Sequence, residues 1–237
     1  MISNNNSLLF FSALCYCFSF STLAAPAQTD SFLQKLLRIS GISATPQRMR
    51  GEEKGEPGQI WLVNIEKLNP VHVGSGNDFH SPVFLPNDTG LLVLRQDQVI
   101  EVSLADAVQK PLFQIPGIIK IIGFDQSDDN HVLILLNDNQ LELVSMDTGS
   151  REKITYPAGD EAELFLSHIK SWDRVYGDTR VYVKTRRKRM ILGQRSFSNV
   201  YYQYNQQPID LSQCKKRSCS QPSLSYDGNS VVFIKSN

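Results

Sequence analysis

The chain has 237 residues and balances 24 Lys and Arg against 24 Asp and Glu, so its formal net charge at pH 7 is zero. Because a neutral chain has no surplus of positive charge to neutralise phosphates, nucleic acid is not a predicted partner. The sequence contains no Walker loop, G-x-S-x-G elbow or dinucleotide fingerprint, which excludes the enzyme classes that depend on these motifs.

Residues 1–25 are predicted to be a cleavable signal peptide. Residues 8–23 are apolar and nearly free of charge, and small residues follow them, so cleavage is expected near Ala25. A membrane-spanning helix needs about 20 apolar residues, and this run is shorter and rich in Ser. The usual positive charge before the apolar run is missing, because residues 1–7 contain no Lys or Arg. We therefore expect a periplasmic or secreted protein.

Residues 26–57 are predicted to form a short helix and a polar linker. The helix spans residues 30–38, with Asp30 as its N-cap and Gly41 as its stop signal. Its apolar side chains follow the spacing of an amphipathic helix. They are Phe32, Leu33, Leu36 and Leu37. Such a helix either packs on the flank of the following domain or docks a partner.

From residue 58 onward one pattern recurs: a Pro or apolar residue, an aromatic residue, a polar turn, and a β-branched run. Its turn aspartates are Asp88, Asp128, Asp178 and Asp227, which are 40 to 50 residues apart. A repeat of this length built from short strands is typical of a β-propeller with one blade per repeat. The copies span residues 81–94, 122–135, 173–183 and 221–234.

The predicted fold class is all-β, with residues 58–237 forming a β-propeller of four-stranded blades. Residues 60–65 have the alternation of a third strand, and residues 69–73 supply a fourth, whereas residues 221–237 supply only a first and second strand. Pairing the two half-blades would close a ring of four blades and cover two open sheet edges. The alternative is an incomplete ring that a second chain closes.

The best copies of the repeat resemble a known family. Residues 222–234 read Pro-x-Leu-Ser-x-Asp-Gly-x-x-Val-Val-Phe-Ile, and residues 60–63 read Ile-Trp-Leu-Val as an opening strand. Both are similar to the WD-like repeat of periplasmic propellers of the TolB type. The resemblance implies a periplasmic propeller that binds proteins.

After removal of the signal, Cys214 and Cys219 are the only cysteines. An even pair in an exported protein predicts a disulfide, here across the connection into the last half-blade. A redox or metal-binding pair is the alternative, although the C-x-x-C spacing and further ligands are missing.

A strongly basic segment lies at residues 184–189, where the third repeat is expected to turn between strands at residues 181–183 and 190–192. The segment is either a solvated hairpin tip that protects a sheet edge, or a patch for anionic lipid, surface glycan or an acidic partner. The candidate binding residues are Lys184, Arg186, Arg187, Lys188 and Arg189.

We predict no catalytic residue, metal site or cofactor, because the histidines are isolated and no pair of carboxylates stands out by spacing. The predicted function is that of an exported, non-catalytic propeller that binds a protein partner in the cell envelope. The alternative is a small propeller hydrolase or lyase acting on a glycan or lactone. Contact with a membrane surface and the oligomeric state stay open.

Overall fold

The computed structural model describes residues 56–125, 128–155, 174–176, 178–190, 193–204, 207–214 and 217–236. These residues belong to the second of two compact units, which spans residues 44–237. The predicted signal peptide (1–25) and amphipathic helix (30–38) lie outside the described residues. Within the described residues, no helix has the length and apolar character needed to cross a membrane.

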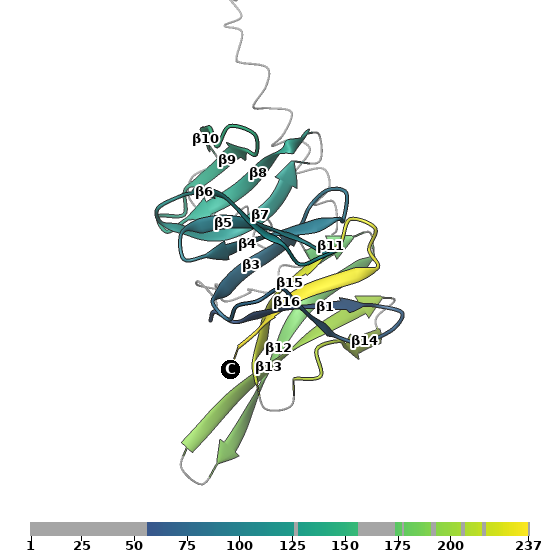
Figure 1. Cartoon of the computed structure of the whole chain (residues 1–237). Helices are drawn as coiled ribbons and strands as arrows, with labels where there is room; N and C mark the ends of the chain where they lie inside the picture. Colours follow the sequence, from purple (N-terminus) through teal and green to yellow (C-terminus); the bar gives the residue numbers. More distant parts are fainter. Residues whose placement is uncertain are drawn as a thin grey trace, which may run out of the picture. The chain divides into compact units, whose positions relative to one another are not determined.

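The described residues form four antiparallel sheets of four strands each (Figure 1). Three of these sheets follow the order of the chain. The first contains β3 (Phe79–Phe84), β4 (Gly90–Arg95), β5 (Gln98–Ser103) and β6 (Gln109–Gln114). The second contains β7 (Ile118–Asp125), β8 (Asp128–Leu136), β9 (Leu141–Ser145) and β10 (Arg151–Ile154). The third contains β11 (Val175–Tyr176), β12 (Thr179–Met190), β13 (Gly193–Tyr204) and β14 (Gln207–Asp210).

The fourth sheet combines the two ends of the described chain. Its order is β15 (Cys219–Leu224), β16 (Ser230–Lys235), β1 (Gln59–Asn64) and β2 (Val71–Val73). The strand β16 pairs with β1 in a register that sets Ile60 opposite Ile234 and Val63 opposite Val231. The predicted pairing between the first and last parts of the domain is therefore confirmed.

The continuous apolar runs in the sequence are explained by sheets that are covered on both faces. In β4, Leu91 and Val93 belong to one hydrophobic cluster, whereas Leu92 and Leu94 belong to another. Because successive side chains of a strand point to opposite faces, each run serves two neighbouring sheets at once. The strand β16 repeats this arrangement, with Phe233 in one cluster and its neighbours in the next.

Three clusters give the order in which the sheets pack. One joins the sheet β3–β6 to β7–β10, the second joins β3–β6 to the composite sheet, and the third joins the composite sheet to β12 and β13. A closed ring of four blades needs a fourth contact, between the sheets β7–β10 and β11–β14, and none of these clusters of described residues supplies it. Four-stranded propeller-like sheets are thus confirmed, and the closed ring stays a prediction.

The repeat turns of β3–β4 and β15–β16 have the same hydrogen bonds. Leu85 N–H donates to the Gly90 carbonyl at 3.0 Å, and Ser225 N–H donates to the Ser230 carbonyl at 2.9 Å. These equivalent bonds align Asp88 with Gly228, and both residues have a positive φ (54° and 74°). Counting from one turn aspartate to the next paired Asp88 with Asp227, which is wrong by one residue. The side chain of Asp227 corresponds instead to that of Asn87, the residue before Asp88.

Replacing Gly228 by Val should lower the free energy of unfolding by about 1–2 kcal/mol, because a β-branched residue resists the left-handed conformation. Gly228→Asp is the matched control, since Asp88 already holds this conformation in the equivalent turn. Urea denaturation of the full chain measures both variants. Equal stability of Gly228→Val and the parent would contradict the assignment of this turn.

The predicted disulfide is present between Cys214 and Cys219. Cys219 begins β15, and Cys214 follows β14, so the bond closes the connection into the composite sheet. Both residues belong to the hydrophobic cluster between that sheet and β12–β13.

Candidate functional site

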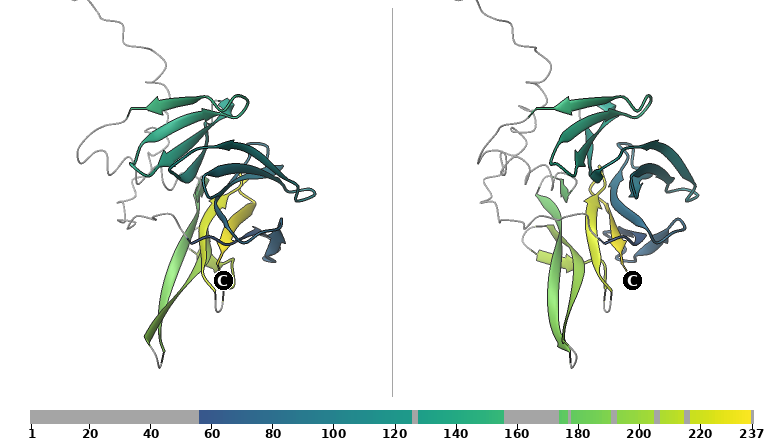
Figure 2. Two further views of the ribbon diagram at one scale, coloured as in Figure 1. Left: turned by 60° about the vertical axis from the view of Figure 1, so that its left-hand side comes forward. Right: turned by 90° about the vertical axis from the view of Figure 1, so that its left-hand side faces the viewer.

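The strands β12 and β13 extend well beyond the rest of their sheet. They pair with each other from Arg180↔Gln203 to Met190↔Gly193. In contrast, β11 pairs only with Thr179 and Arg180, and β14 pairs only with residues 201–204 of β13. Residues 183–190 and 193–200 therefore form a two-stranded ribbon, which projects past its neighbours in every view (Figures 1 and 2).

The ribbon corrects the predicted position of the basic segment. Residues 184–189 were expected at a hairpin tip, but they lie inside the single strand β12, which continues to Met190. The reason is chemical, because this segment contains none of the Gly, Asn, Asp or Pro residues that form tight turns. Met190 ends β12 and pairs with Gly193, so it does not begin a separate strand, and residues 191 and 192 lie outside the described residues.

Alternation along the two strands gathers cations and aromatic rings on one side of the ribbon and its base. Residues opposite each other in register share a face, and so do every second residues along a strand. We name this side the cationic face. It carries Arg180, Tyr182, Lys184 and Arg186 from β12 and Phe197, Asn199, Tyr201 and Gln203 from β13. The side chains of Lys188 and Arg189 lie outside the described part of the chain.

Contacts between the side chains confirm that they share this face. The rings of Tyr182 and Tyr201 stack with centroids 5.7 Å apart and an interplanar angle of 20°. Arg186 Nη2 donates to the Tyr201 hydroxyl at 2.8 Å, and Lys184 Nζ lies 6.0 Å from the centroid of the same ring. The guanidinium of Arg180 lies 5.6 Å from the Tyr182 ring. The aromatic rings thus hold the cations in place by cation–π and hydrogen-bond contacts.

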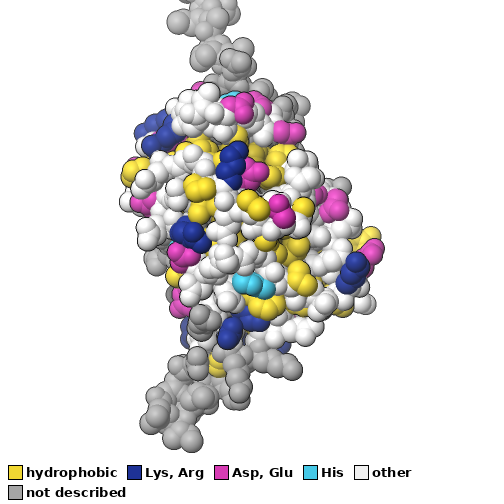
Figure 3. Space-filling model, viewed as in Figure 1, with side chains coloured by type: hydrophobic (Ala, Val, Ile, Leu, Met, Phe, Trp, Pro, Cys, Tyr) yellow, Lys and Arg dark blue, Asp and Glu magenta, His cyan; other side chains and the backbone are white. Residues whose placement is uncertain are grey.

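Lys184 and Arg186 are exposed, and neither forms an ion pair with another residue in the described part of the chain. The nearest carboxylate in register is that of Asp210, opposite Tyr201. Its oxygens accept hydrogen bonds from Asn199, the Ser212 hydroxyl and the Gln213 N–H. Figure 3 shows charges of both signs interspersed over the described surface that faces the viewer. The cationic face is therefore a local concentration of positive charge.

The opposite side of the ribbon has a different character. At the base, Val181 and Val200 are buried in the cluster that contains Phe233 of β16. Further out, Thr185 and Arg187 are exposed. The ribbon is thus anchored by apolar side chains on one side of its base and carries the cationic face on the other.

A second group of contacts links the first strands of three sheets, and sequence reasoning missed it. Ser81 N–H donates to Gln221 Oε1 at 2.6 Å, and the Ser81 hydroxyl accepts from Ile121 N–H at 2.9 Å. Both Ser81 and Gln221 have positive φ, and each precedes a proline at a bulge in its strand. The matching Ser-Pro and Gln-Pro pairs at the start of two repeats were the available signal.

The repeat turns of two sheets are also connected directly. The carboxylate of Asp88 accepts hydrogen bonds from the N–H groups of Tyr226 at 2.9 Å and Asp227 at 3.0 Å. Partial burial raises the pKa of Asp88 above its ordinary value of 3.8, and these donors reduce the rise. The hydroxyl of Ser225 lowers the pKa of Asp227, followed by the Asn229 N–H. The contact therefore joins two turns that each carry an aspartate, and the pKa values of these two carboxyl groups shift in opposite directions.

Asp88→Asn should change the pH dependence of stability in a defined direction. A carboxyl with a raised folded pKa makes the folded protein more stable as pH falls through that pKa toward 3.8. The stability of the parent relative to Asp88→Asn should therefore increase as pH falls from neutral toward 3.8. Asp227→Asn should show the reverse, a relative loss for the parent below pH 3.8, because its pKa is lowered. Chemical denaturation across pH measures both, and equal slopes would contradict the assignment.

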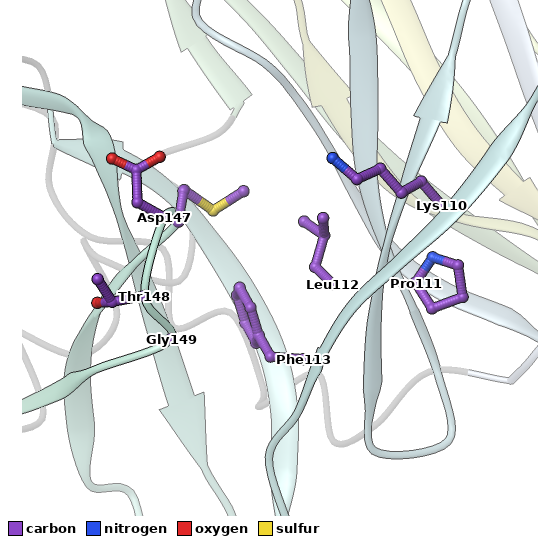
Figure 4. A pocket seen from close by; sticks show the side chains of 8 residues that line it. Lys110, Pro111, Leu112, Phe113, Asp147, Thr148 and Gly149 are labelled. Atoms are coloured by element: carbon purple, nitrogen blue, oxygen red, sulfur yellow. The ribbon is translucent and has the colours of Figure 1, made fainter.

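A shallow cavity of about 270 Å³ lies between β6 and the β9–β10 turn (Figure 4). Lys110 and Asp147 lie on opposite sides of it, with Leu112 between them. The remaining lining residues are Pro111, Phe113, Met146, Thr148 and Gly149. The cavity offers space for one apolar side chain beside one charge of each sign. Elsewhere among the described residues, no group of three His, Cys, Asp or Glu side chains is arranged to hold a metal ion.

No family model and no curated protein matches the chain. Solved structures do show similarity. A TolB candidate from Agrobacterium tumefaciens is 15% identical, with a TM-score of 0.37, 75% of this chain covered and 60% of that one. The β-propeller domain of the Trilobed protease from Pyrococcus furiosus is 13% identical, with a TM-score of 0.32 and coverages of 68% and 51%. An acylaminoacyl peptidase from Pyrococcus horikoshii is 11% identical, with a TM-score of 0.32 and coverages of 68% and 29%.

This chain therefore spans less than two thirds of the length of each of these structures. The fold-level resemblance expected from the repeats is found again in the first of them. At these identities and TM-scores, the similarities transfer no activity, partner or site residue to this chain.

Proposed function

We propose that this chain is an exported, non-catalytic β-propeller of four blades that binds a protein partner in the periplasm or cell envelope. The observation that carries the proposal is the cationic face, which extends on a ribbon beyond its own sheet. Export rests on the predicted signal peptide at residues 1–25. The four-bladed ring rests on the pairing of β1 with β16 and on the three clusters between neighbouring sheets.

A purely structural role does not explain the ribbon well. A two-stranded hairpin is marginally stable in water, because it buries little apolar surface. Beyond Val181 and Val200, the described side chains of this ribbon are mostly polar and leave much of their surface to solvent. Such a projection with organised cations fits a surface that is completed by a partner. The positive charge of the ribbon attracts an oppositely charged protein over a long range, and this attraction raises the rate of association.

Affinity purification from a periplasmic extract tests this proposal. A tagged full chain should recover a specific envelope protein, and Lys184→Ser with Arg186→Ser should reduce the recovery several-fold. The matched control is Lys67→Ser with Lys153→Ser, which removes two exposed cations away from the ribbon. Equal recovery with all three proteins, or a chain retained in the cytoplasm, would contradict the proposal.

A further inference from the structure

We propose that the cationic face binds an acidic partner segment in an extended conformation, with its carboxylates at alternate residues. This inference rests on the proposed function and names the chemistry of the partner that the same surface accepts. It follows from the spacing of the cations, the orientation of their donors and the edges of the ribbon that no described strand covers.

The spacing of the cations matches that of an extended peptide. Alternate residues of a strand lie about 6.6–6.8 Å apart. Lys184 and Arg186 occupy successive alternate positions of β12, and Arg180 lies in the same row two alternate positions before Lys184. An extended acidic segment with Asp or Glu at every second residue presents carboxylates with the same period. Each cation can then meet one carboxylate without bending either strand.

Contacts with Tyr201 orient the hydrogen-bond donors of Lys184 and Arg186 before a carboxylate binds. Arg186 uses one of the five N–H donors of its guanidinium on the Tyr201 hydroxyl, and within the described part of the chain the others bond no further residue. Lys184 lies over the same ring, and Tyr201 itself is only 7% exposed. The tyrosine therefore limits the motion of both cations, so less side-chain entropy is lost when a ligand binds. Charge-assisted hydrogen bonds to carboxylates are the stronger class of hydrogen bond.

The edges of the ribbon favour a peptide as the ligand. Beyond Arg180, β12 pairs with no described strand other than β13. Before Val200, whose N–H and carbonyl hydrogen-bond Ser212 and Leu211, β13 likewise pairs with no described strand other than β12. Unpaired backbone groups along such edges are templates for an added strand. A peptide can therefore add main-chain hydrogen bonds to the contacts with the cationic face.

An anionic membrane is the less favoured ligand on the described residues. Surface-bound elements insert exposed apolar side chains between lipid headgroups. The described residues have six exposed large apolar side chains, and none of them lies on the ribbon itself, although Val175 lies opposite Arg180 at its base. They are Leu68, Val71, Val108, Val175, Tyr204 and Ile209.

Two peptides of identical composition test the inference on the purified full chain. One alternates Glu and Thr, and its isomer carries all Glu residues in one block. The alternating peptide should bind several-fold tighter by fluorescence anisotropy, and its affinity should fall as salt screens the charges. Lys184→Ser with Arg186→Ser should weaken this binding by about tenfold or more, because two charged contacts are lost. Arg187→Ser with Lys153→Ser removes the same charge away from the cationic face and should have much less effect.

Three results would overturn the inference. They are equal binding of the two peptides, equal losses in the two double variants, or binding of phosphatidylglycerol vesicles but neither peptide. If the envelope protein is still recovered through Lys184 and Arg186 in these cases, only the class of partner segment is wrong. If that recovery also fails to depend on the two cations, the proposed function itself is wrong.

Discussion

Deletion of residues 230–237 should abolish cooperative unfolding of the full chain. The deletion removes β16, which pairs with β15 on one side and β1 on the other. Its four central side chains, from Val231 to Ile234, are fully buried in two clusters. Burial of four such side chains contributes on the order of 6–12 kcal/mol, which is comparable with the whole stability of a typical domain. Thermal denaturation followed by circular dichroism measures the effect.

A change in an edge strand is the control for this deletion. Replacing Glu152, Lys153 and Ile154 of β10 by Ser should keep a cooperative transition, because these side chains are exposed or half-buried. A truncated chain that unfolds with the parent's midpoint would show that β16 does not join the two ends of the chain.

Phe233→Ala should lower the free energy of unfolding by about 3–5 kcal/mol, as expected for a large side chain removed from a core. Phe233 is 0% exposed and packs in the cluster that contains Val181 and Val200 of the ribbon base. Phe233→Leu should cost less, because it fills more of the cavity. Urea denaturation of the disulfide-bonded chain provides the measurement.

Tyr204→Ala is the matched control, since this ring is 53% exposed on the same sheet as the ribbon. Its effect should stay within about 0.5 kcal/mol. A loss below about 1 kcal/mol for Phe233→Ala would contradict the packing of the composite sheet against β12 and β13.

The parts of the fold that were predicted correctly depend on turn-forming residues and on sheet edges that need a partner strand. The turn residues Asp227 and Gly228 marked a hairpin, and the apolar run after them marked a buried strand. The pairing of β16 with β1 was predictable because each end of the domain supplied only half of a sheet. Cys214 and Cys219 were paired by elimination, since no other cysteine follows the signal.

The ribbon could not be predicted in the same way. A strand that is exposed on both faces has no alternation of apolar and polar residues, so the basic segment of β12 lacks the pattern that marks a strand. Its turn also lacks the Asn-Gly or Asp-Gly pair that usually marks a hairpin. The cationic face appears only when the register with β13 is known, because Tyr201 and Arg186 are 15 residues apart in sequence.

The contacts between sheets were equally inaccessible from the sequence. Asp88 and Tyr226 are separated by 138 residues, and the carboxylate binds a backbone N–H that every residue type except proline carries. Such a bond leaves no pattern in the side chains of the segment that donates it. Only the packing order of the sheets brings the two turns together.

Photo-crosslinking in intact cells tests most directly that the cationic face binds a protein partner. A photoreactive residue is placed at Arg186 in one variant and at Arg187 in another. Each variant loses one exposed arginine, and the two positions are adjacent on β12 but point to opposite faces of the ribbon. The account predicts a specific crosslink to an envelope protein from position 186 and little or none from position 187. Equal crosslinking from both positions, or a crosslink from position 187 alone, would contradict it.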